Sequence, residues 1–222
     1  MDVTFTFDGT GLEDTVVVVF ETLYTEKKEV AVHADITDEK QSVYLPKIQT
    51  KAEDAVTKIN HTEAKPEATI IDTVSYSSLL PGKEYTMTGT LMNKKTGEPI
   101  LIDGEPITAS TTFTAEKSEG SVEVVFKFDA SVLEGTTVVA FESLTYNGIE
   151  VAIHADIEDK DQTVYIPDVH TTATATDTKD HVTGANEDLI ITDEVVLTGL
   201  KVGNEYTVKG VLMDKTTGKE LL

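Results

Sequence analysis

The sequence predicts an all-β protein made of tandem β-sandwich modules, one complete and two partial. Two observations lead to this prediction. Helical periodicity is nearly absent, and short runs rich in Val, Ile, Thr, Tyr and Phe alternate with clusters of Gly, Asp, Asn and Lys. In addition, one long block of sequence occurs twice. The first observation gives the fold class, and the second gives the organisation of the chain.

The repeated block defines the length of a module. Residues 30–46 read VAVHADITDEKQSVYLP and residues 151–167 read VAIHADIEDKDQTVYIP, an offset of 121 residues (Gln162 minus Gln41). The offset holds without insertion on both sides of the block, and a period this long indicates whole domains in tandem. Because 222 residues hold fewer than two periods, we expect the C-terminal part of one module, a complete module and the N-terminal part of the next, at residues 1–48, 49–168 and 169–222.

Seven strands are expected in the complete module, in the pattern of an immunoglobulin-like sandwich. Each is a short run of β-branched and aromatic residues, and several alternate small or polar residues with larger ones, as strands with one solvated face do. In chain order the predicted strands span residues 68–76, 84–92, 107–115, 121–129, 136–144, 150–157 and 162–167. A further short strand, IQTKA, begins at Ile48.

Turn residues separate these strands. Pro81 and Gly82 predict a turn before one strand, and Gly97 suits a hairpin bulge. Residues 129–135 are expected to form one helical turn capped by Asp129. A proline ends the last strand before each joint, and only two or three residues then separate the modules, so we expect neighbours to be held at a nearly fixed angle, as in a stiff rod.

The composition limits the partners. The chain has 18 Lys and Arg against 40 Asp and Glu, a formal net charge of −22 that is spread over all three segments. This charge disfavours nucleic acid and anionic membranes, and no apolar stretch is long enough to insert into a membrane. Neighbouring modules of the same array are the expected partners. Cys is absent, which excludes disulfides and thiolate metal sites.

Five polar residues inside the predicted strands form the candidate site. Glu142 follows the apolar run 138–141, where we expect it at the rim of the core with a raised pKa. Taken singly, four of the five are ordinary in or at the ends of strands, whereas an Asp among β-branched neighbours, as in TIIDTVSY, is disfavoured. All five are repeated together at the module offset, however, while many surrounding residues change. The set is Thr50, Asp72, Glu142, His154 and Gln162, and the equivalents in the partial modules are Glu21, His33, Gln41, Thr171 and Asp193.

Two familiar chemistries fit this set poorly. One His with two carboxylates can bind a metal ion, but Gln and Thr would be superfluous, so no metal or other cofactor is expected. Thr, His and Asp can act as the nucleophile, base and orienting group of a hydrolase. Against this, the sequence shows no Gly-rich elbow or oxyanion loop.

The motifs that contain these residues carry a resemblance to a known family. They read VVVFETL at 17–23, TIIDTVSYSSLLPGKEYTMTGTLM at 69–92, VVAFESL at 138–144, HADIEDKDQTVYIP at 154–167 and HTTATATD at 170–177. In combination they resemble the VaFE-repeat, or Thr-Gln ester-bond, domains of Gram-positive surface adhesins. The resemblance extends over essentially the whole chain and implies sandwiches of the CnaB type.

The resemblance implies a covalent ester between a Thr near the first strand and a Gln near the last. By motif, Thr50 would be joined to Gln162, with Asp72, Glu142 and His154 as the catalytic residues of a single self-modification. We choose Thr50 because it aligns with Thr171, the first Thr of the second joint. Two other residues, Thr57 and Thr62, are weaker candidates for the cross-linked Thr.

The implied function is a structural stalk repeat of a cell-wall-anchored, extracellular adhesin, not an enzyme with turnover. Two alternatives stay open. One is a non-covalent binding module for a host protein or glycan. The other is a Lys-Asn isopeptide sandwich of the pilin type, which the sequence disfavours because the Asn residues of the complete module all lie in predicted loops, at Asn60, Asn93 and Asn147.

The partial modules carry complementary halves of one site. The first holds Glu21, His33 and Gln41, and the last holds Thr171 and Asp193. The two parts are therefore expected to be able to associate head to tail between molecules. Together they lack the equivalent of residues 102–121, which includes a strand.

Overall fold

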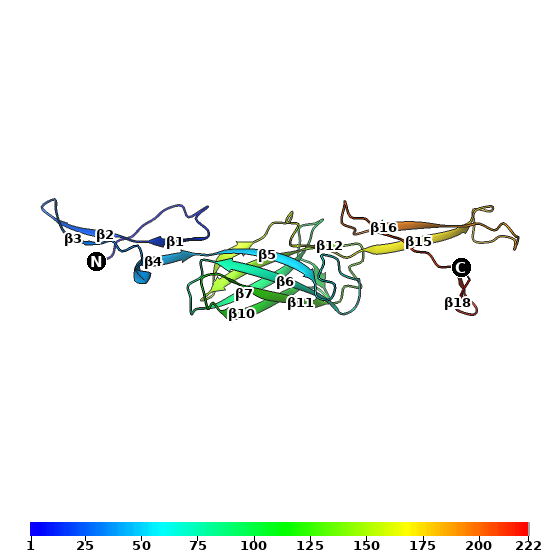
Figure 1. Ribbon diagram of the computed structural model, residues 1–222, viewed down its shortest axis with the longest axis horizontal. Helices are drawn as coiled ribbons and strands as arrows, with labels where there is room; N and C mark the ends of the chain where they lie inside the picture. Colours follow the sequence, from blue (N-terminus) through cyan, green and yellow to red (C-terminus); the bar gives the residue numbers. More distant parts are fainter. Residues whose placement is uncertain (222) are drawn as a thin grey trace.

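The computed structural model describes residues 1–221 and is built almost entirely of β-strands. The strands are arranged along a rod, with a compact sandwich in the middle and a narrow ribbon of strands at each end (Figure 1). The N- and C-terminal ribbons extend from opposite ends of the sandwich (Figure 1). We refer to residues 1–45 as the N-terminal segment, to the sandwich of strands β5 to β14 as the middle module, and to residues 167–221 as the C-terminal segment.

The middle module contains two antiparallel sheets. One has the strand order β10-β7-β12-β13, with β14 also paired to β12, and the other has the order β11-β6-β5. A small β8-β9 hairpin lies beside them. The strands are β5 (Lys47–Asp54), β6 (Ala68–Ser77), β7 (Glu84–Asn93), β8 (Leu101–Ile102), β9 (Glu105–Pro106), β10 (Thr108–Thr114), β11 (Gly120–Phe128), β12 (Thr137–Tyr146), β13 (Ile149–His154) and β14 (Thr163–Tyr165).

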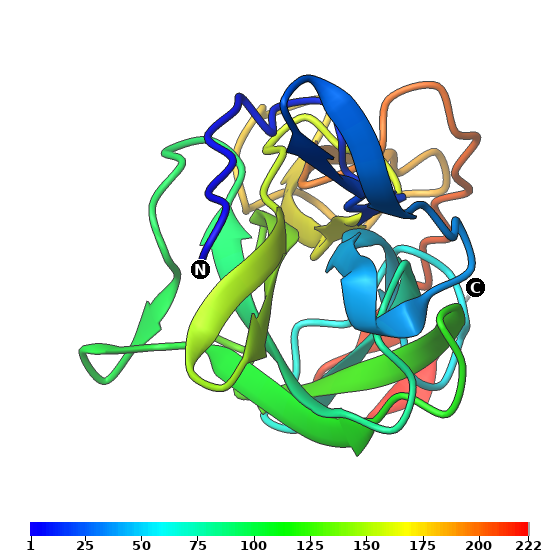
Figure 2. The same ribbon diagram turned by 90° about the vertical axis from the view of Figure 1, so that its left-hand side faces the viewer.

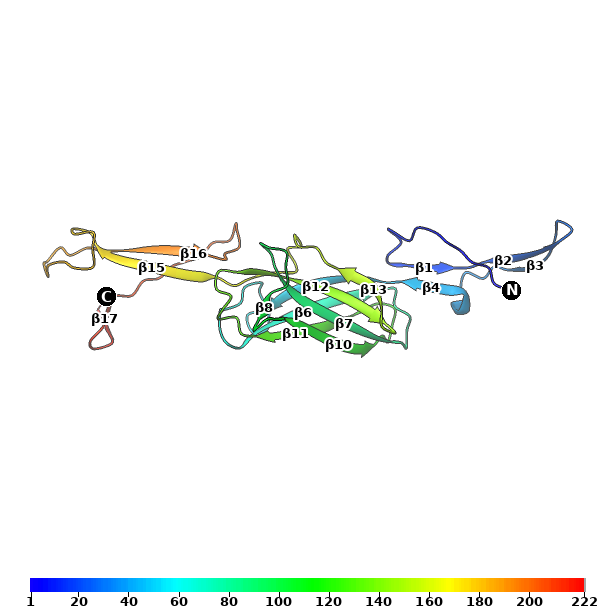
Figure 3. The same ribbon diagram turned by 180° about the vertical axis from the view of Figure 1, so that it is seen from behind.

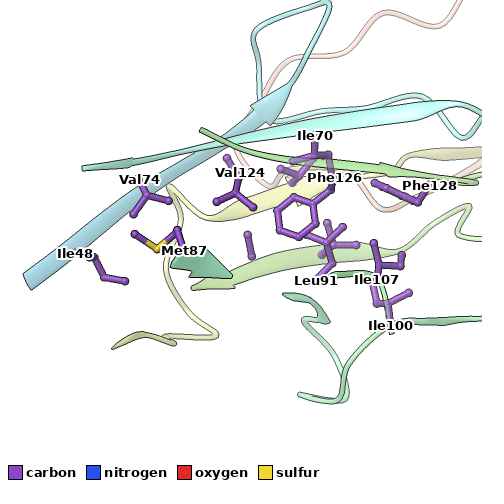
Figure 4. Packing of buried hydrophobic residues seen from close by; sticks show 14 of the residues in the cluster. Ile48, Ile70, Val74, Met87, Leu91, Ile100, Ile107, Val124, Phe126 and Phe128 are labelled. Carbon is purple, nitrogen blue, oxygen red and sulfur yellow. The ribbon is translucent and has the colours of Figure 1, made fainter. Parts of the chain in front are cut away.

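The core of the middle module lies between these sheets. Alternate residues of β6 and β7 are buried, as expected for strands with one face inward. Phe126 on β11 is fully buried and lies between Ile70, its cross-strand partner on β6, and Leu91 on β7 of the opposite sheet (Figure 4). The alternation therefore brings large apolar side chains of both sheets into one cluster.

The all-β prediction is confirmed, and all seven predicted strands of the complete module are present. Their observed ends lie within a few residues of the predicted ones, and the short strand predicted at Ile48 is part of the eight-residue strand β5. The helical turn expected at residues 129–135 is wrong, because that segment forms turns without a helix. Asp129 nevertheless caps the first of them: its Oδ1 accepts a hydrogen bond from the Ser131 backbone N–H at 2.9 Å.

The end segments repeat strands of the middle module without closing a sandwich. The N-terminal segment forms a β2-β3 hairpin and a β1-β4 pair, and the C-terminal segment forms a β15-β16 pair and a β17-β18 hairpin. Figure 3 shows both ribbons from the other side. The elements are β1 (Thr15–Val18), β2 (Glu21–Thr25), β3 (Lys28–His33), the 3-10 turn η1 (Glu39–Gln41), β4 (Ser42–Leu45), β15 (Asp168–Ala175), β16 (Ile191–Thr198), β17 (Met213–Asp214) and β18 (Lys219–Glu220).

The second joint packs backbone against backbone. The backbone N–H of Gly135 donates to the Ile166 carbonyl at 2.9 Å. Gly199 adopts a φ of +65°, and a Cβ at this position would lie 2.7 Å from the Ile166 oxygen and 2.9 Å from the Gly135 carbonyl carbon. Only glycine fits here, because any side chain would push the C-terminal segment away from the middle module.

The first joint has the same arrangement one module earlier. Asp14, the equivalent of Gly135, donates its backbone N–H to the Leu45 carbonyl at 2.9 Å. Ser78, the equivalent of Gly199, donates its hydroxyl to Asp14 Oδ1 at 3.2 Å. Seen along the rod, the N-terminal segment projects in front of the sandwich (Figure 2). Both joints thus hold a loop of one unit against a turn of the next.

Over residues 1–221, the structure has no helix with the length and apolar character needed to cross a membrane.

The core packing predicts a difference between two equivalent glycines. A Cβ on Gly89 would lie 2.5 Å from Phe126 Cζ and 3.1 Å from Val124 Cγ1, whereas a Cβ on Gly210, its equivalent, would meet nothing within 4 Å. We expect Gly89→Ala to destabilise the middle module by about 1–3 kcal/mol because its core is overpacked. Gly210→Ala should leave the melting temperature unchanged. Calorimetric unfolding of both variants checks this, and equal melting temperatures would contradict the packing described here.

Candidate cross-linking site

Four of the five candidate residues of the middle module meet inside the sandwich. Thr50 lies on β5 and Asp72 on the adjacent strand β6, while Glu142 lies on β12 of the opposite sheet. Gln162 immediately precedes β14. All four are buried: Asp72 and Gln162 are 0% exposed, Glu142 1% and Thr50 9%. The prediction that Glu142 lies at the rim of the core is wrong, because the residue is fully buried. It lies on β12, an interior strand of its sheet, which pairs with β7 on one edge and with β13 and β14 on the other.

Backbone hydrogen bonds hold the two cross-linking candidates in place. The Gln162 carbonyl accepts from the Ala140 N–H on β12 at 3.1 Å. The carbonyl of its neighbour, Asp161, accepts from the Ala52 N–H on β5 at 2.8 Å. The loop that carries Gln162 is therefore fastened both to the strand of Glu142 and to the strand of Thr50.

Glu142 contacts the amide of Gln162. Gln162 Nε2 donates a hydrogen bond to Glu142 Oε2 at 2.6 Å, and both atoms are buried. An amide nitrogen leaves as ammonia only when it receives a proton. Glu142 is thus positioned beside the nitrogen that an ester-forming reaction would have to expel.

The site concentrates unsatisfied polar atoms. Among residues 1–221, five buried side-chain oxygens have no hydrogen-bond partner, and all of them belong to the four residues of this cluster. They are Thr50 Oγ1, both Asp72 Oδ atoms, Glu142 Oε1 and Gln162 Oε1. Each such group costs about 1–3 kcal/mol, so a fold that served only stability would not keep them together.

Burial shifts the acidity of both carboxyl groups. Loss of hydration and, after it, the neighbouring carboxyl of Asp72 together raise the pKa of Glu142 from 4.5 to about 11. Burial also raises the pKa of Asp72. The Thr50 hydroxyl interacts with both carboxyl groups and lowers the pKa of each, although it makes no hydrogen bond of standard geometry. Two buried carboxyls this close cannot both be ionised, so Glu142 holds a proton at neutral pH.

The fifth candidate, His154, lies at the solvent side of the cluster. It pairs across the sheet with Glu142, and its side chain is 23% exposed. His154, Thr50 and Asp159 all line a surface cleft of about 520 Å³. The imidazole therefore borders both the Thr50 strand and solvent, which suits a group that exchanges protons between them.

Asp159 is a site residue that the sequence reasoning missed. Its Oδ2 lies 2.8 Å from His154 Nε2. Burial raises the pKa of Asp159, but hydrogen bonds from His154 and from the backbone N–H groups of Asp161 and Gln162 outweigh it and hold the pKa below its usual value. The repeat contained the signal, because Asp159 corresponds to Asp38 of the first block.

Two weaker Thr candidates are occupied elsewhere. Thr62 Oγ1 donates to Asp54 Oδ2 at 2.7 Å, and Thr57 Oγ1 donates to Asp54 Oδ1 at 3.0 Å. Asp54 Oδ1 also accepts from the backbone N–H groups of Val56 and Thr57. These hydroxyls fasten the loop after β5, whereas the Thr50 hydroxyl is left beside the carboxyl pair.

The equivalents in the end segments are not assembled into one site. Glu21 pairs with His33 in the N-terminal segment, as Glu142 pairs with His154. Thr171 and Asp193 lie on β15 and β16 in the C-terminal segment. The structure thus contains one complete site and two halves at opposite ends of the rod (Figure 1).

In the part of the chain that the structure describes, no group of three or more His, Cys, Asp or Glu residues is arranged to hold a metal ion.

Comparison with known proteins places the chain in a family. The family model of the T-Q ester bond containing domain matches residues 1–45, 46–166 and 167–221. No curated protein matches the chain. Similar solved structures include a bacterial adhesin from Mobiluncus mulieris containing intramolecular disulfide, isopeptide and ester bond cross-links, with 15% identity, a TM-score of 0.44, and coverage of 70% of this chain and 74% of that one. A putative beta-galactosidase from Bacteroides fragilis gives 12% identity and a TM-score of 0.37, with coverage of 52% and 17%. Because the family matches cover nearly all of the sequence, the chain belongs to the T-Q ester bond containing domains.

Proposed function

We propose that the chain is a structural stalk repeat of a bacterial cell-surface adhesin, stabilised by an autocatalytic ester between Thr50 and Gln162. The observation that carries this proposal is the set of five unsatisfied buried oxygens on Thr50, Asp72, Glu142 and Gln162. Ester formation gives these atoms a role that packing alone does not. The Asp72-Glu142 pair provides the acid that the reaction needs.

The reaction is an acyl transfer within one molecule. Thr50 Oγ attacks the Gln162 side-chain carbonyl carbon, a C–O bond forms, and the C–N bond breaks as the nitrogen leaves with the added proton as ammonia. Glu142, which contacts Gln162 Nε2 at 2.6 Å, supplies a proton to the leaving nitrogen. Thr50 loses its hydroxyl proton, and the Asp72-Glu142 pair takes it up, which restores the proton that Glu142 gave to the nitrogen. The pair therefore ends with the same number of protons.

His154 and Asp159 support the proton transfers from the rim. The Asp159 carboxylate orients the imidazole, as a carboxylate does for the histidine of other nucleophilic sites. The sandwich holds the Thr and Gln side chains together at high effective concentration and keeps bulk water from the ester once it has formed. The module therefore modifies itself once and does not turn over a substrate.

The position of the bond supports a mechanical role. Thr50 lies on the first strand of the middle module, and Gln162 immediately precedes the last. Tension along the rod enters and leaves through these strands, so a covalent link between them carries force around the hydrogen-bonded sheets. If cross-links act as disulfides do in the chain-entropy account, closing this loop also stabilises the module by about 4–5 kcal/mol. A closed loop also resists proteolytic opening.

The two joints favour a stalk over a hinged pair of domains. Gly135 and Gly199 hold successive units in close backbone contact at one joint, and a side-chain hydrogen bond from Ser78 to Asp14 links them at the other. The surroundings of such a stalk would be the cell wall of a Gram-positive bacterium, outside the cell. The charge of −22 suits an exposed array whose units repel each other in solution.

The isopeptide alternative has less support. Among residues 1–221, the buried polar side chains include no Lys and no Asn. An isopeptide requires both to react in a dry site, and the buried pair in this module is Thr50 with Gln162.

Intact mass tests the ester directly. The chain should weigh less than its sequence by one ammonia, and Thr50→Ala or Gln162→Ala should restore the full mass. The matched controls are Thr171→Ala and Gln41→Ala, equivalents whose partners are not in the same module. Both controls should keep the loss. Full sequence mass in folded wild-type protein would contradict the proposal. A cross-link that shows the ammonia loss but resists cleavage by hydroxylamine would favour an isopeptide.

Asp159 should affect the rate of cross-linking and not the packing of the core. We expect Asp159→Ala to slow ammonia loss at least tenfold, because the His154 ring loses its orienting partner. Asp38→Ala, which breaks the equivalent 2.9 Å contact to His33, should leave the rate unchanged. Mass sampled during refolding from denaturant gives both rates. Equal rates of ammonia loss in the two variants would show that His154 does not need the Asp159 carboxylate.

The buried acid pair predicts a stability that depends on pH. Without the ester, Glu142 has a pKa of about 11 in the folded chain and of 4.5 when unfolded. Thr50→Ala cannot form the ester and removes a hydroxyl that lowers this pKa, so the pKa stays raised in the variant. The contribution of Glu142 is full below pH 4.5 and is lost as pH rises towards the folded pKa. The unfolding free energy should therefore fall by up to about 1.4 kcal/mol per pH unit above that point.

Denaturant titrations of Thr50→Ala between about pH 5 and pH 8 measure this slope. The control is the double variant Thr50→Ala with Glu142→Gln, in which the slope due to this group should disappear. Parallel curves for the two proteins would show that Glu142 is not held protonated in the folded module.

A further inference from the structure

Lys94, immediately after β7, is a further polar residue that the repeat retains. Its equivalent at the module offset is Lys215, whereas its neighbour Lys95 becomes Thr216. The comparison that distinguished the five site residues from their surroundings therefore also distinguishes this lysine.

The turn after β7 does not itself require a lysine. Asn93 Oδ1 accepts hydrogen bonds from the backbone N–H groups two and three residues further on, at 2.9 and 3.3 Å. In the second copy Asp214 Oδ1 accepts the same bonds at 2.7 and 3.2 Å. These bonds join a side-chain oxygen to the backbone, so the role of Lys94 lies outside the turn.

The Lys94 side chain reaches across β12 to the loop that carries Gln162. Its backbone N–H donates to the Thr137 carbonyl on the β7 side of β12 at 3.0 Å, while β14 pairs with the opposite edge of β12. Lys94 Nζ donates to the Ile157 carbonyl at 2.8 Å and lies 3.5 Å from Thr163 Oγ1, at the start of β14. The lysine thus spans the strand that carries Glu142.

The hydrogen bond to Ile157 is stronger than the neighbouring ion pair. Glu158, the acidic partner of Lys94, is 78% exposed, and its Oε2 lies 3.4 Å from Nζ, whereas the lysine side chain is 26% exposed. Solvent weakens an ion pair with so exposed a carboxylate. A short hydrogen bond from an ammonium to a carbonyl is charge-assisted. The backbone of the loop is therefore the partner that matters.

The loop that Lys94 holds, residues 155–162, contains no strand. Two backbone hydrogen bonds fasten its C-terminal end to the sheets, at the carbonyls of Asp161 and Gln162. Lys94 fastens its first half, at Ile157. The lysine therefore fixes the part of the loop that the backbone bonds do not reach.

Asp159 lies between these fixed points and connects them to the reacting groups. Its Oδ2 contacts His154 Nε2 at 2.8 Å. Its Oδ1 accepts from the backbone N–H groups of Asp161 at 2.7 Å and of Gln162 at 3.4 Å. A shift of the loop at Ile157 would therefore move the His154 ring and the Gln162 side chain together.

From these contacts we infer that Lys94 is a positioning residue for the cross-link between Thr50 and Gln162, because its ammonium fixes the loop that presents Gln162 and Asp159. The effect on the covalent step rests on the function proposed above, whereas the fixing of the loop does not. Lys94 acts through the loop and not on the reacting atoms. A misplacement of about 1 Å can slow a reaction about a hundredfold, so a tether at this distance affects the rate.

The rate of ammonia loss tests this role. Lys94→Met keeps the length of the side chain but removes its charge, and it should slow the loss about tenfold or more. Lys94→Arg can still donate to the Ile157 carbonyl and should restore most of the rate. Two controls, Lys95→Met in the same turn and Glu158→Gln, should keep the wild-type rate. Equal rates in Lys94→Met and Lys95→Met, measured by mass during refolding, would overturn the inference.

A residue that only stabilises the fold gives a different pattern. Such a residue changes the fraction of folded chains and not the rate at which folded chains react. The rates are therefore compared in conditions where denaturant titration shows the unreactive double variant, Thr50→Ala with Lys94→Met, to be fully folded. A Lys94→Met rate that equals the wild-type rate in those conditions would overturn the positioning role.

Hydrogen exchange separates this inference from the proposed function. In Thr50→Ala, which cannot form the ester, adding Lys94→Met should speed exchange of the Asp161 and Gln162 backbone amides about tenfold or more, because the tether is lost. Adding Lys95→Met instead should not.

The outcomes are distinct. Unchanged exchange would overturn the tether even if the ester forms. Ammonia loss that Lys94→Met does not slow would overturn the positioning role and leave the proposed function intact. No ammonia loss in wild-type chain, together with faster exchange in the Lys94 variant, would support the tether and refute the covalent chemistry of both proposals.

Discussion

The buried Asp72-Glu142 carboxyl pair is the constraint on which the rest of the site depends. Two acids from opposite sheets are brought together in a region that water does not reach. Loss of hydration and, after it, the neighbouring Asp72 carboxyl keep a proton on Glu142. The same sandwich that creates this cost also brings the Thr50 and Gln162 side chains to the pair. An ester between them would consume the unpaired hydroxyl and remove the amide nitrogen. Under the proposed function, the polar cluster is the reactive state of the module, and its five unpaired buried oxygens are those of the reacting groups and the acid pair.

Much of this could be predicted from the sequence because the chain contains its own comparison. Runs of β-branched residues predicted the strands, and the 121-residue offset distinguished five polar residues from their neighbours. The burial of Glu142 could not be predicted in the same way. It depends on β12 being paired on both sides, with β7 on one edge and with β13 and β14 on the other, and those pairings join residues far apart in sequence. Asp159 lies in an acidic loop, where nothing local separates a carboxylate that orients His154 from one that is merely solvated.

In the stalk that we propose, the joints would give the modules a second role. A single sandwich with an internal cross-link resists unfolding, but an array also needs a fixed relation between neighbours. The Ser78 hydroxyl bonds the Asp14 carboxylate at one joint, and Gly199 packs closely against Gly135 at the other, so both joints place a contact between units at equivalent positions. The end segments repeat strands of the middle module, and apolar residues such as Phe5, the equivalent of the buried Phe126, are exposed there.

Peptide mapping of the folded chain tests the central claim most directly. Cleavage after lysine would release residues 48–51 and 161–179 as separate peptides if Thr50 and Gln162 were unmodified. The ester predicts one branched peptide that joins them, lighter than their sum by one ammonia, and hydroxylamine should split it at the Thr50 oxygen. Two separate linear peptides with an intact Gln162 side chain would contradict the account.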